Sequence, residues 1–170
     1  KRSLLGQRQD DRSNQRQRWR KLRANWLRIT MPTRCANWPE ALAAYIDRKR
    51  NEPFAWGVND CCLFGADWIQ LCTGLDPAAT LRGTYDSALS GVRVLEKHGG
   101  LIGTIQTHME PLGFKPIGQG FASRGDIAVR DCGNGDTMGI VLGSTAAFVG
   151  KDGLQFANLN DGAETRFWKI

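Results

Sequence analysis

Cys61 is the residue of this sequence best placed to act as a nucleophile. A cysteine reacts as the thiolate, and the first turn of a helix favours a thiolate because its free N–H groups and its dipole attract negative charge. Asp60 can cap a helix that begins at about Cys61, after a loop that contains Gly57 and Asn59. Backbone N–H groups of this loop could also bind an oxyanion. The other interpretation is structural: Cys61 and Cys62 are small buried side chains, and Cys62 faces the core.

A general base for Cys61 is not evident from the sequence. A cysteine nucleophile needs a base within hydrogen-bond reach. The sequence has two histidines, His98 at the end of one predicted helix and His108 on the next. We interpret both as surface or capping residues, because a cation is favourable at the C-terminus of a helix, as at His98. Cys61 is therefore a candidate catalytic residue without an assigned base.

The five cysteines do not indicate a disulfide framework or a metal site. Their number is odd, no two have C-x-x-C spacing, and neither histidine lies near a cysteine pair with zinc-finger spacing. We interpret Asp131, Asp136 and Asp152 as turn residues, because aspartate is common in turns. The sequence therefore predicts no cofactor and no bound metal.

Helical periodicity dominates the first part of residues 31–170. Asn37 is a candidate N-cap for the first helix, with Pro39 in its first turn, where a missing N–H costs nothing. The patterns predict helices over 38–50, from about Cys61 to a stop at Gly74, from a cap at Asp86 to Gly99, and over 101–109.

After Pro111 the pattern changes to the alternation that is typical of strands. It predicts strands over 126–131, 137–143, 145–149 and 153–159, with a hairpin turn at Asn134-Gly135. A further strand over 165–169 is predicted at the edge of the sheet, with Trp168 covering that edge. Because the helices come first and an antiparallel sheet follows them, the fold class is α+β.

The positive charge of the chain is confined to its beginning. Residues 1–30 carry ten Lys and Arg against two Asp, and the remaining residues have a net charge of −2. Residues 31–170 therefore show no sign of nucleic-acid binding. Trp19, Leu22, Trp26 and Ile29 recur at helical spacing, so this segment could form a basic docking helix. Its composition favours a disordered leader, or residues upstream of a start at Met31.

Two targeting features are missing from the sequence. No run of apolar residues is long enough for a membrane span, and no apolar stretch follows the basic start as in a secretory signal. We therefore expect a cytoplasmic protein, or one that belongs to a particle assembled in a cytoplasm.

Two segments resemble the signature motifs of the NlpC-type cell-wall peptidases, a circularly permuted branch of the papain-like folds. Residues 54–62, Phe-Ala-Trp-Gly-Val-Asn-Asp-Cys-Cys, are similar to the motif that opens the nucleophile helix of that family. Arg124-Gly125-Asp126-Ile127, followed by residues 137–143, is similar to the family's second motif. The segment from Trp38 to Ile46 and the first motif also resemble small phage and prophage proteins encoded among tail genes.

The resemblance implies an NlpC-type domain over residues 31–170 of a tailed-phage protein, made in the host cytoplasm and carried in the tail of the virion. It also implies that Thr137 stands where the family has its catalytic histidine, and threonine cannot take a proton from a thiol at neutral pH. Two functions stay open. The domain is a degenerate module that docks on other tail-tip or hub proteins, or it is an active cysteine peptidase or amidase acting on peptidoglycan peptides.

Overall fold

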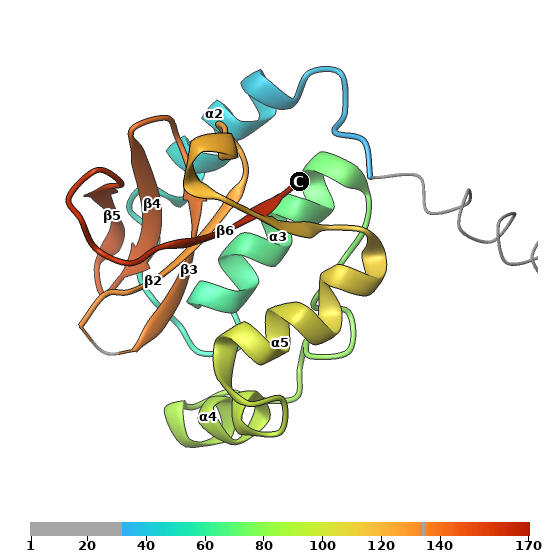
Figure 1. Ribbon diagram of the computed structural model, residues 1–170. Helices are drawn as coiled ribbons and strands as arrows, with labels where there is room; N and C mark the ends of the chain where they lie inside the picture. Colours follow the sequence, from blue (N-terminus) through green and yellow to red (C-terminus); the bar gives the residue numbers. More distant parts are fainter. Residues whose placement is uncertain (1–31, 134) are drawn as a thin grey trace, which may run out of the picture. The chain divides into compact units, whose positions relative to one another are not determined.

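The structure is a computed structural model that describes residues 32–133 and 135–170. In these ranges four α-helices come first and pack on one six-stranded antiparallel sheet (Figure 1). The predicted α+β class is therefore confirmed. The predictions for residues 1–30 fall outside the described residues. None of the helices in the described ranges has the length and apolar character that a membrane crossing requires.

The sequence pattern predicts all four of these helices, with small differences at their ends. Asp60 caps the second helix as expected, since its Oδ1 accepts the N–H of Leu63 at 3.0 Å. Ser87, rather than Asp86, caps the third helix and exchanges hydrogen bonds with Ser90. The helices are α2 (Trp38–Lys49), α3 (Cys61–Thr73), α4 (Ala88–Glu96) and α5 (Gly100–His108).

The sheet has the strand order β1-β6-β2-β3-β4-β5. The predicted position of the last strand at the edge is wrong, because β6 lies between β1 and β2. Trp168 is consequently part of the main core, 2% exposed, rather than the cover of an edge. The strands are β1 (Lys115–Ile117), which the sequence pattern did not predict, β2 (Ile127–Asp131), β3 (Asp136–Val141), β4 (Thr145–Gly150), β5 (Gly153–Asn158) and β6 (Arg166–Lys169).

Helix α3 lies against the sheet and carries most of the contact between the two layers (Figure 1). Its buried side chains include Phe64, Trp68 and Ile69, which pack with Ile127 and Ile140 of the sheet. The indole N–H of Trp68 also donates to the carbonyl of Gly125 at 2.8 Å. These contacts fix the start of α3, and with it Cys61, relative to the strands.

Gly139 of β3 has no room for a side chain. A Cβ at this position would lie 2.5 Å from the carbonyl oxygen of Ala147 and 2.5 Å from the ring of Phe148. Gly139→Ala is therefore expected to lower the free energy of unfolding by about 1–3 kcal/mol, as overpacking of a core does. Urea unfolding followed by circular dichroism measures the change.

The matched control is Gly120→Ala, because a Cβ at Gly120 would meet nothing within 4 Å and its φ is not positive. This variant should unfold within about 0.5 kcal/mol of the parent protein. Equal stability of the two variants would contradict the close approach of β3 and β4.

Candidate functional site

The loop that precedes α3 is held in place by a buried asparagine. Asn59 is 1% exposed, and its amide donates to the carbonyls of Glu52 and Pro53 at 3.2 and 3.0 Å. Its side-chain oxygen accepts a hydrogen bond from Lys49 Nζ at 3.1 Å. Every hydrogen-bonding atom of this side chain is therefore engaged in shaping the loop.

Asp60 and Gly57 complete the loop and fix the position of Cys61. While one carboxylate oxygen of Asp60 caps α3, the other accepts the N–H of Gly57 at 2.9 Å. Gly57 has φ +70°, and a Cβ there would collide with the backbone of Tyr85. Cys61 is thereby placed at the first position of α3, as predicted. The Gly-x-Asn-Asp part of the first motif has a structural explanation in these contacts.

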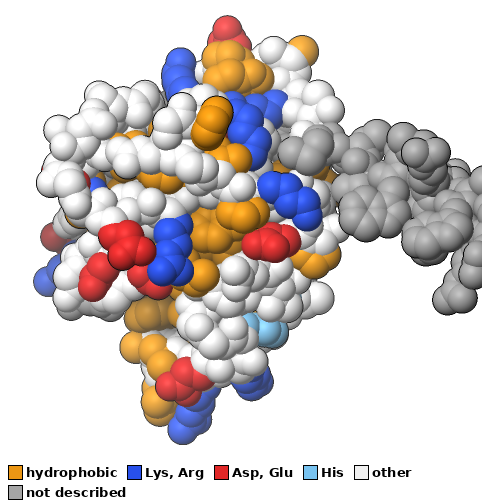
Figure 2. All heavy atoms as spheres, viewed as in Figure 1, with side chains coloured by type: hydrophobic (Ala, Val, Ile, Leu, Met, Phe, Trp, Pro, Cys, Tyr) orange, Lys and Arg blue, Asp and Glu red, His pale blue; other side chains and the backbone are white. Residues whose placement is uncertain are grey.

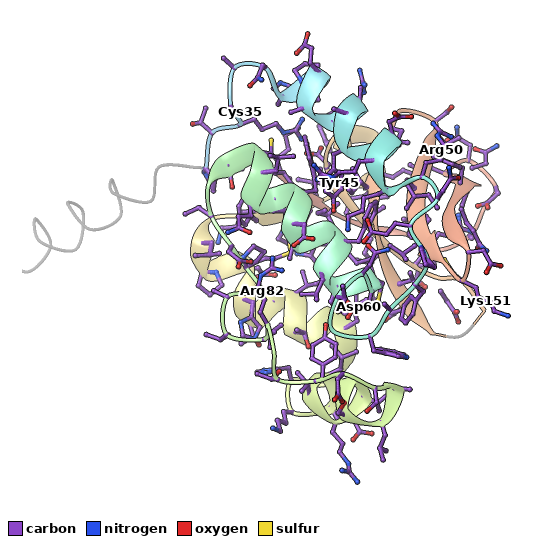
Figure 3. The ribbon with its side chains drawn as sticks, turned by 180° about the vertical axis from the view of Figure 1, so that it is seen from behind. Cys35, Tyr45, Arg50, Asp60, Arg82 and Lys151 are labelled. Carbon is purple, nitrogen blue, oxygen red and sulfur yellow. The ribbon has the colours of Figure 1, made fainter. Side chains whose placement is uncertain are left out.

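Cys61 lies in a pocket of about 640 Å³ between the start of α3, the helix α4 with the segment that leads into it, and the sheet. This volume is typical of small-molecule and peptide-binding sites. Figure 3 labels two residues of the pocket lining, Asp60 on the helix side and Lys151 on the sheet side. The lining is mostly apolar and consists of Phe54, Trp56, Asp60, Cys61, Cys62, Leu81, Tyr85, Gly91, Val92, Val94, Leu95, Cys132, Asp136, Thr137, Phe148, Val149, Gly150, Lys151 and Gln155.

Thr137 lines the same pocket as Cys61, so the structure brings the two motifs together. Strand β3 pairs with β2 from Asp136 onward, but its pairing with β4 begins at Gly139. The first part of β3 therefore borders the pocket. The backbone of Met138, next to Thr137, is one of the groups that lower the pKa of Cys61.

The two histidines lie beside each other, away from this pocket. Their ring centroids are 5.0 Å apart with the rings edge to face. Of the described residues that line the pocket of Cys61, none is a histidine. His108 instead borders a second cavity of about 30 Å³, behind Cys62. Burial and the neighbouring His98 lower the pKa of His108.

The Nε2 atom of His108 is buried and has no hydrogen-bond partner among the described residues. The lowered pKa favours the neutral form of the imidazole, and the missing partner is consistent with apolar surroundings. His108 is therefore a half-buried residue in the last turn of α5, where the sequence indicated a surface or capping residue, and it does not line the pocket of Cys61.

The pKa values of the adjacent Cys61 and Cys62 thiols are shifted in opposite directions. The hydrogen bond from the Cys62 thiol lowers the pKa of Cys61, and the N–H groups of Met138 and Cys62 act in the same direction. Burial and the Asp60 carboxylate oppose this change. The pKa of Cys62 is raised well above its ordinary value by the same hydrogen bond and by burial. Cys61 is thus the more acidic thiol of the pair.

Some residues of the pocket could not be found from the sequence. Burial and the nearby Asp60 carboxylate raise the pKa of Tyr85, so its phenol stays protonated. Cys132, at the turn after β2, brings a third thiol into the pocket. Trp56 packs edge to face with Phe54 at 4.8 Å between centroids. Of these four residues, Phe54 and Trp56 were marked in the sequence, because both belong to the first motif, whereas Tyr85 and Cys132 were not.

The described residues offer no evident metal site. Within 32–133 and 135–170, no three His, Cys, Asp or Glu side chains are grouped so that they could hold a metal ion. Among the described residues, the polar side chains of the pocket include the three thiols, the phenol of Tyr85, Thr137, Gln155, and the charged groups of Asp60, Asp136 and Lys151.

The aspartate of the second motif has a structural role. Asp126 is 0% exposed and accepts hydrogen bonds from Ser123, Lys169 and the backbone of Ile170. Its other strong partner is the guanidinium of Arg34. Asp126 therefore joins the beginning and the end of the described chain at the start of β2.

The fold and the site define an α+β domain with a cysteine at the start of a helix, in a pocket against an antiparallel sheet. A family model described as "Domain of unknown function (DUF6950)" matches residues 33–170, and the chain belongs to this family. No curated protein matches the chain.

Proposed function

We propose that residues 31–170 form a degenerate NlpC-type domain that acts as a docking module in the tail tip, or in the assembly of the tail, of a tailed phage. The motif resemblance supports this proposal. The two motifs are more than sixty residues apart in the sequence, yet they supply Cys61 and Thr137 to one pocket. An NlpC-type arrangement requires this proximity of the helix start and the strand.

The main support for a degenerate rather than an active domain is that no histidine is found among the described residues of the pocket. Thr137 occupies the position at which the resemblance implies a histidine. A thiol that lacks an imidazole partner gains much less acidity than one that has it. Acyl transfer by Cys61 should consequently be slow or absent.

The surface around the pocket favours a protein partner. Leu89 and Val92 on α4 are 63% and 46% exposed, and Val58 in the motif loop is 68% exposed. Figure 2 shows hydrophobic side chains gathered over α4 at the lower left of the view. Exposed apolar side chains beside an apolar pocket are typical of interaction sites. We propose that another tail-tip or hub protein places an apolar segment here, in the cytoplasm during assembly and then in the virion.

A second function is an active cysteine peptidase or amidase that cleaves peptidoglycan peptides. The lowered pKa of Cys61 and the substrate-sized pocket favour it. In this case another group of the pocket, or of a partner chain, would have to act as the base.

Alkylation of Cys61 between pH 5 and 9 separates the two functions. If the domain is a docking module, we expect the pH midpoint of Cys61 alkylation to lie below that of a free cysteine. It should still lie clearly above the acidic midpoints of cysteines paired with an imidazole. The docking module also predicts no release of peptides from peptidoglycan. Peptide mapping assigns the alkylated cysteine, and Cys61→Ala serves as the control. An acidic midpoint together with turnover that Cys61→Ala abolishes would establish the enzyme instead.

Complementation of a phage or prophage that lacks the gene tests the docking role. Cys61→Ala should support assembly of infectious particles, because the thiol is not needed and its removal costs little stability. Val92→Glu should reduce particle yield, because it places a charge at the proposed interface. Normal yield with Val92→Glu and loss of yield with Cys61→Ala would contradict the docking module.

A further inference from the structure

A second pair of cysteines, Cys35 and Cys72, lies at the C-terminal end of α3, whereas the pocket lies at its start. The N–H of Cys35 donates to the carbonyl of Cys72 at 2.7 Å. Figure 3 shows Cys35 on the segment that passes the end of α3. Given standard backbone dimensions, this hydrogen bond limits the separation of the two Cα atoms to about 6.5 Å. Disulfides typically join Cα atoms that are roughly 4.4–6.8 Å apart.

The two thiols are neighbours, since the Cys35 thiol is one of the groups that raise the pKa of Cys72. Cys72 is 1% exposed and belongs to the main core, whereas Cys35 is partly exposed. An oxidant from solvent can therefore reach Cys35 first, and Cys72 is in position to complete a bond.

The segment that carries Cys35 is held in place from both sides. Arg34 donates to the carbonyls of Ile170 and Arg124 at 2.9 and 2.6 Å and forms an ion pair with Asp126. On the other side, the N–H of Trp38 donates to the carbonyl of Cys35 at 3.1 Å. The backbone hydrogen bond between Cys35 and Cys72 is thus anchored by neighbouring contacts of the folded chain.

We propose that Cys35 and Cys72 form a reversible disulfide when the folded domain meets a disulfide oxidant such as oxidised glutathione. The bond would close a loop of the chain that contains α2, the motif loop and Cys61. This inference rests on the backbone geometry of the pair and is independent of the function proposed for the pocket. For a virion protein, the bond would form after release from a reducing cytoplasm.

The reaction proceeds by two thiol–disulfide exchanges. The thiolate of Cys35 attacks one sulfur of oxidised glutathione, and one glutathione thiolate leaves. The thiolate of Cys72 then attacks the Cys35 sulfur of the mixed disulfide, and the second glutathione leaves. The two cysteines lose two protons and two electrons, and the oxidant is reduced to two thiols. Burial raises the pKa of Cys72 to about 11, so the second step should be the slower one.

The test is oxidation of the purified full chain with oxidised glutathione at pH 8, followed by alkylation of the remaining thiols and peptide mapping. We expect a linked Cys35–Cys72 peptide that disappears on treatment with a reductant. The melting temperature should rise by roughly 10 °C, because a loop of this size is closed in the unfolded state.

Matched variants show whether the rise belongs to this pair. Cys35→Ser should abolish both the linked peptide and the rise, whereas Cys132→Ser should leave both unchanged. The proposal fails if the native chain keeps Cys35 and Cys72 alkylatable after prolonged oxidation, or if Cys61 and Cys132 are linked instead. Because the peptide map is made on the native chain, it decides the question even if a variant does not fold.

Discussion

Exchanging Thr137 for histidine is expected to lower the pH midpoint of Cys61 alkylation by several pH units. Thr137 and Cys61 line one pocket, and the backbone of the next residue, Met138, already lowers the pKa of Cys61. An imidazolium at position 137 would therefore be placed to stabilise the thiolate. Cysteines paired with histidine have pKa values several units below that of a free thiol. Alkylation with peptide mapping, over pH 4–9, measures the midpoint.

Thr145→His is the matched control, because Thr145 begins the neighbouring strand β4 and is not part of the pocket lining. It should leave the midpoint of Cys61 unchanged. An unchanged midpoint in a folded Thr137→His variant would show that position 137 does not correspond to the histidine of NlpC-type enzymes. A lowered midpoint with new peptidoglycan hydrolysis, abolished by Cys61→Ala, would support descent from an active enzyme.

The helices could be predicted from the sequence because their signals are local. Asp60 and Gly74 mark the two ends of α3, and the capping hydrogen bond and the left-handed Gly74 confirm both. The cap of α4 was misplaced by one residue because Asp86 and Ser87 are both good capping residues. Side-chain geometry decides between them, and Ser87 has its partner in Ser90.

The arrangement of the sheet could not be predicted because it depends on distant pairings. Strand β1 is three residues long and contains Pro116, so its sequence lacks the alternation of a strand. Its register pairs Lys115 with Lys169, at the other end of the sheet-forming region. This pairing moves β6 into the interior of the sheet and buries Trp168.

The candidate site was predictable only where a motif marks it. The first motif contains the residues that shape the loop, so the position of Cys61 followed from local chemistry. Tyr85, Phe148 and Cys132 come to the pocket from three other segments, and nothing in their own sequence neighbourhoods indicates this. The contact between His98 and His108 likewise arises from the packing of α4 and α5.

The second large effect is expected from Asp126→Ala, which should lower the free energy of unfolding by about 3–5 kcal/mol. Asp126 is fully buried and neutralises Arg34, whose side chain is 11% exposed, while Lys169 approaches its other oxygen at 3.1 Å. Removing the carboxylate leaves Arg34 nearly buried without its counterion. It also deprives the backbone N–H groups of Ser123 and Ile170 of their acceptor. Urea unfolding, followed by tryptophan fluorescence, measures the loss.

Asp152→Ala is the control for this substitution, because Asp152 is an exposed turn residue and its loss should change stability by less than about 0.5 kcal/mol. A loss below about 1 kcal/mol for Asp126→Ala would mean that the contacts of Arg34 with the carbonyls of Ile170 and Arg124 suffice to compensate its charge. A large loss has a further consequence. Since Arg34 holds the segment that bears Cys35, Asp126→Ala should also slow the formation of the Cys35–Cys72 disulfide. The buried aspartate of the second motif would then act on the fold at the C-terminal end of α3, rather than on the chemistry of Cys61 at its start.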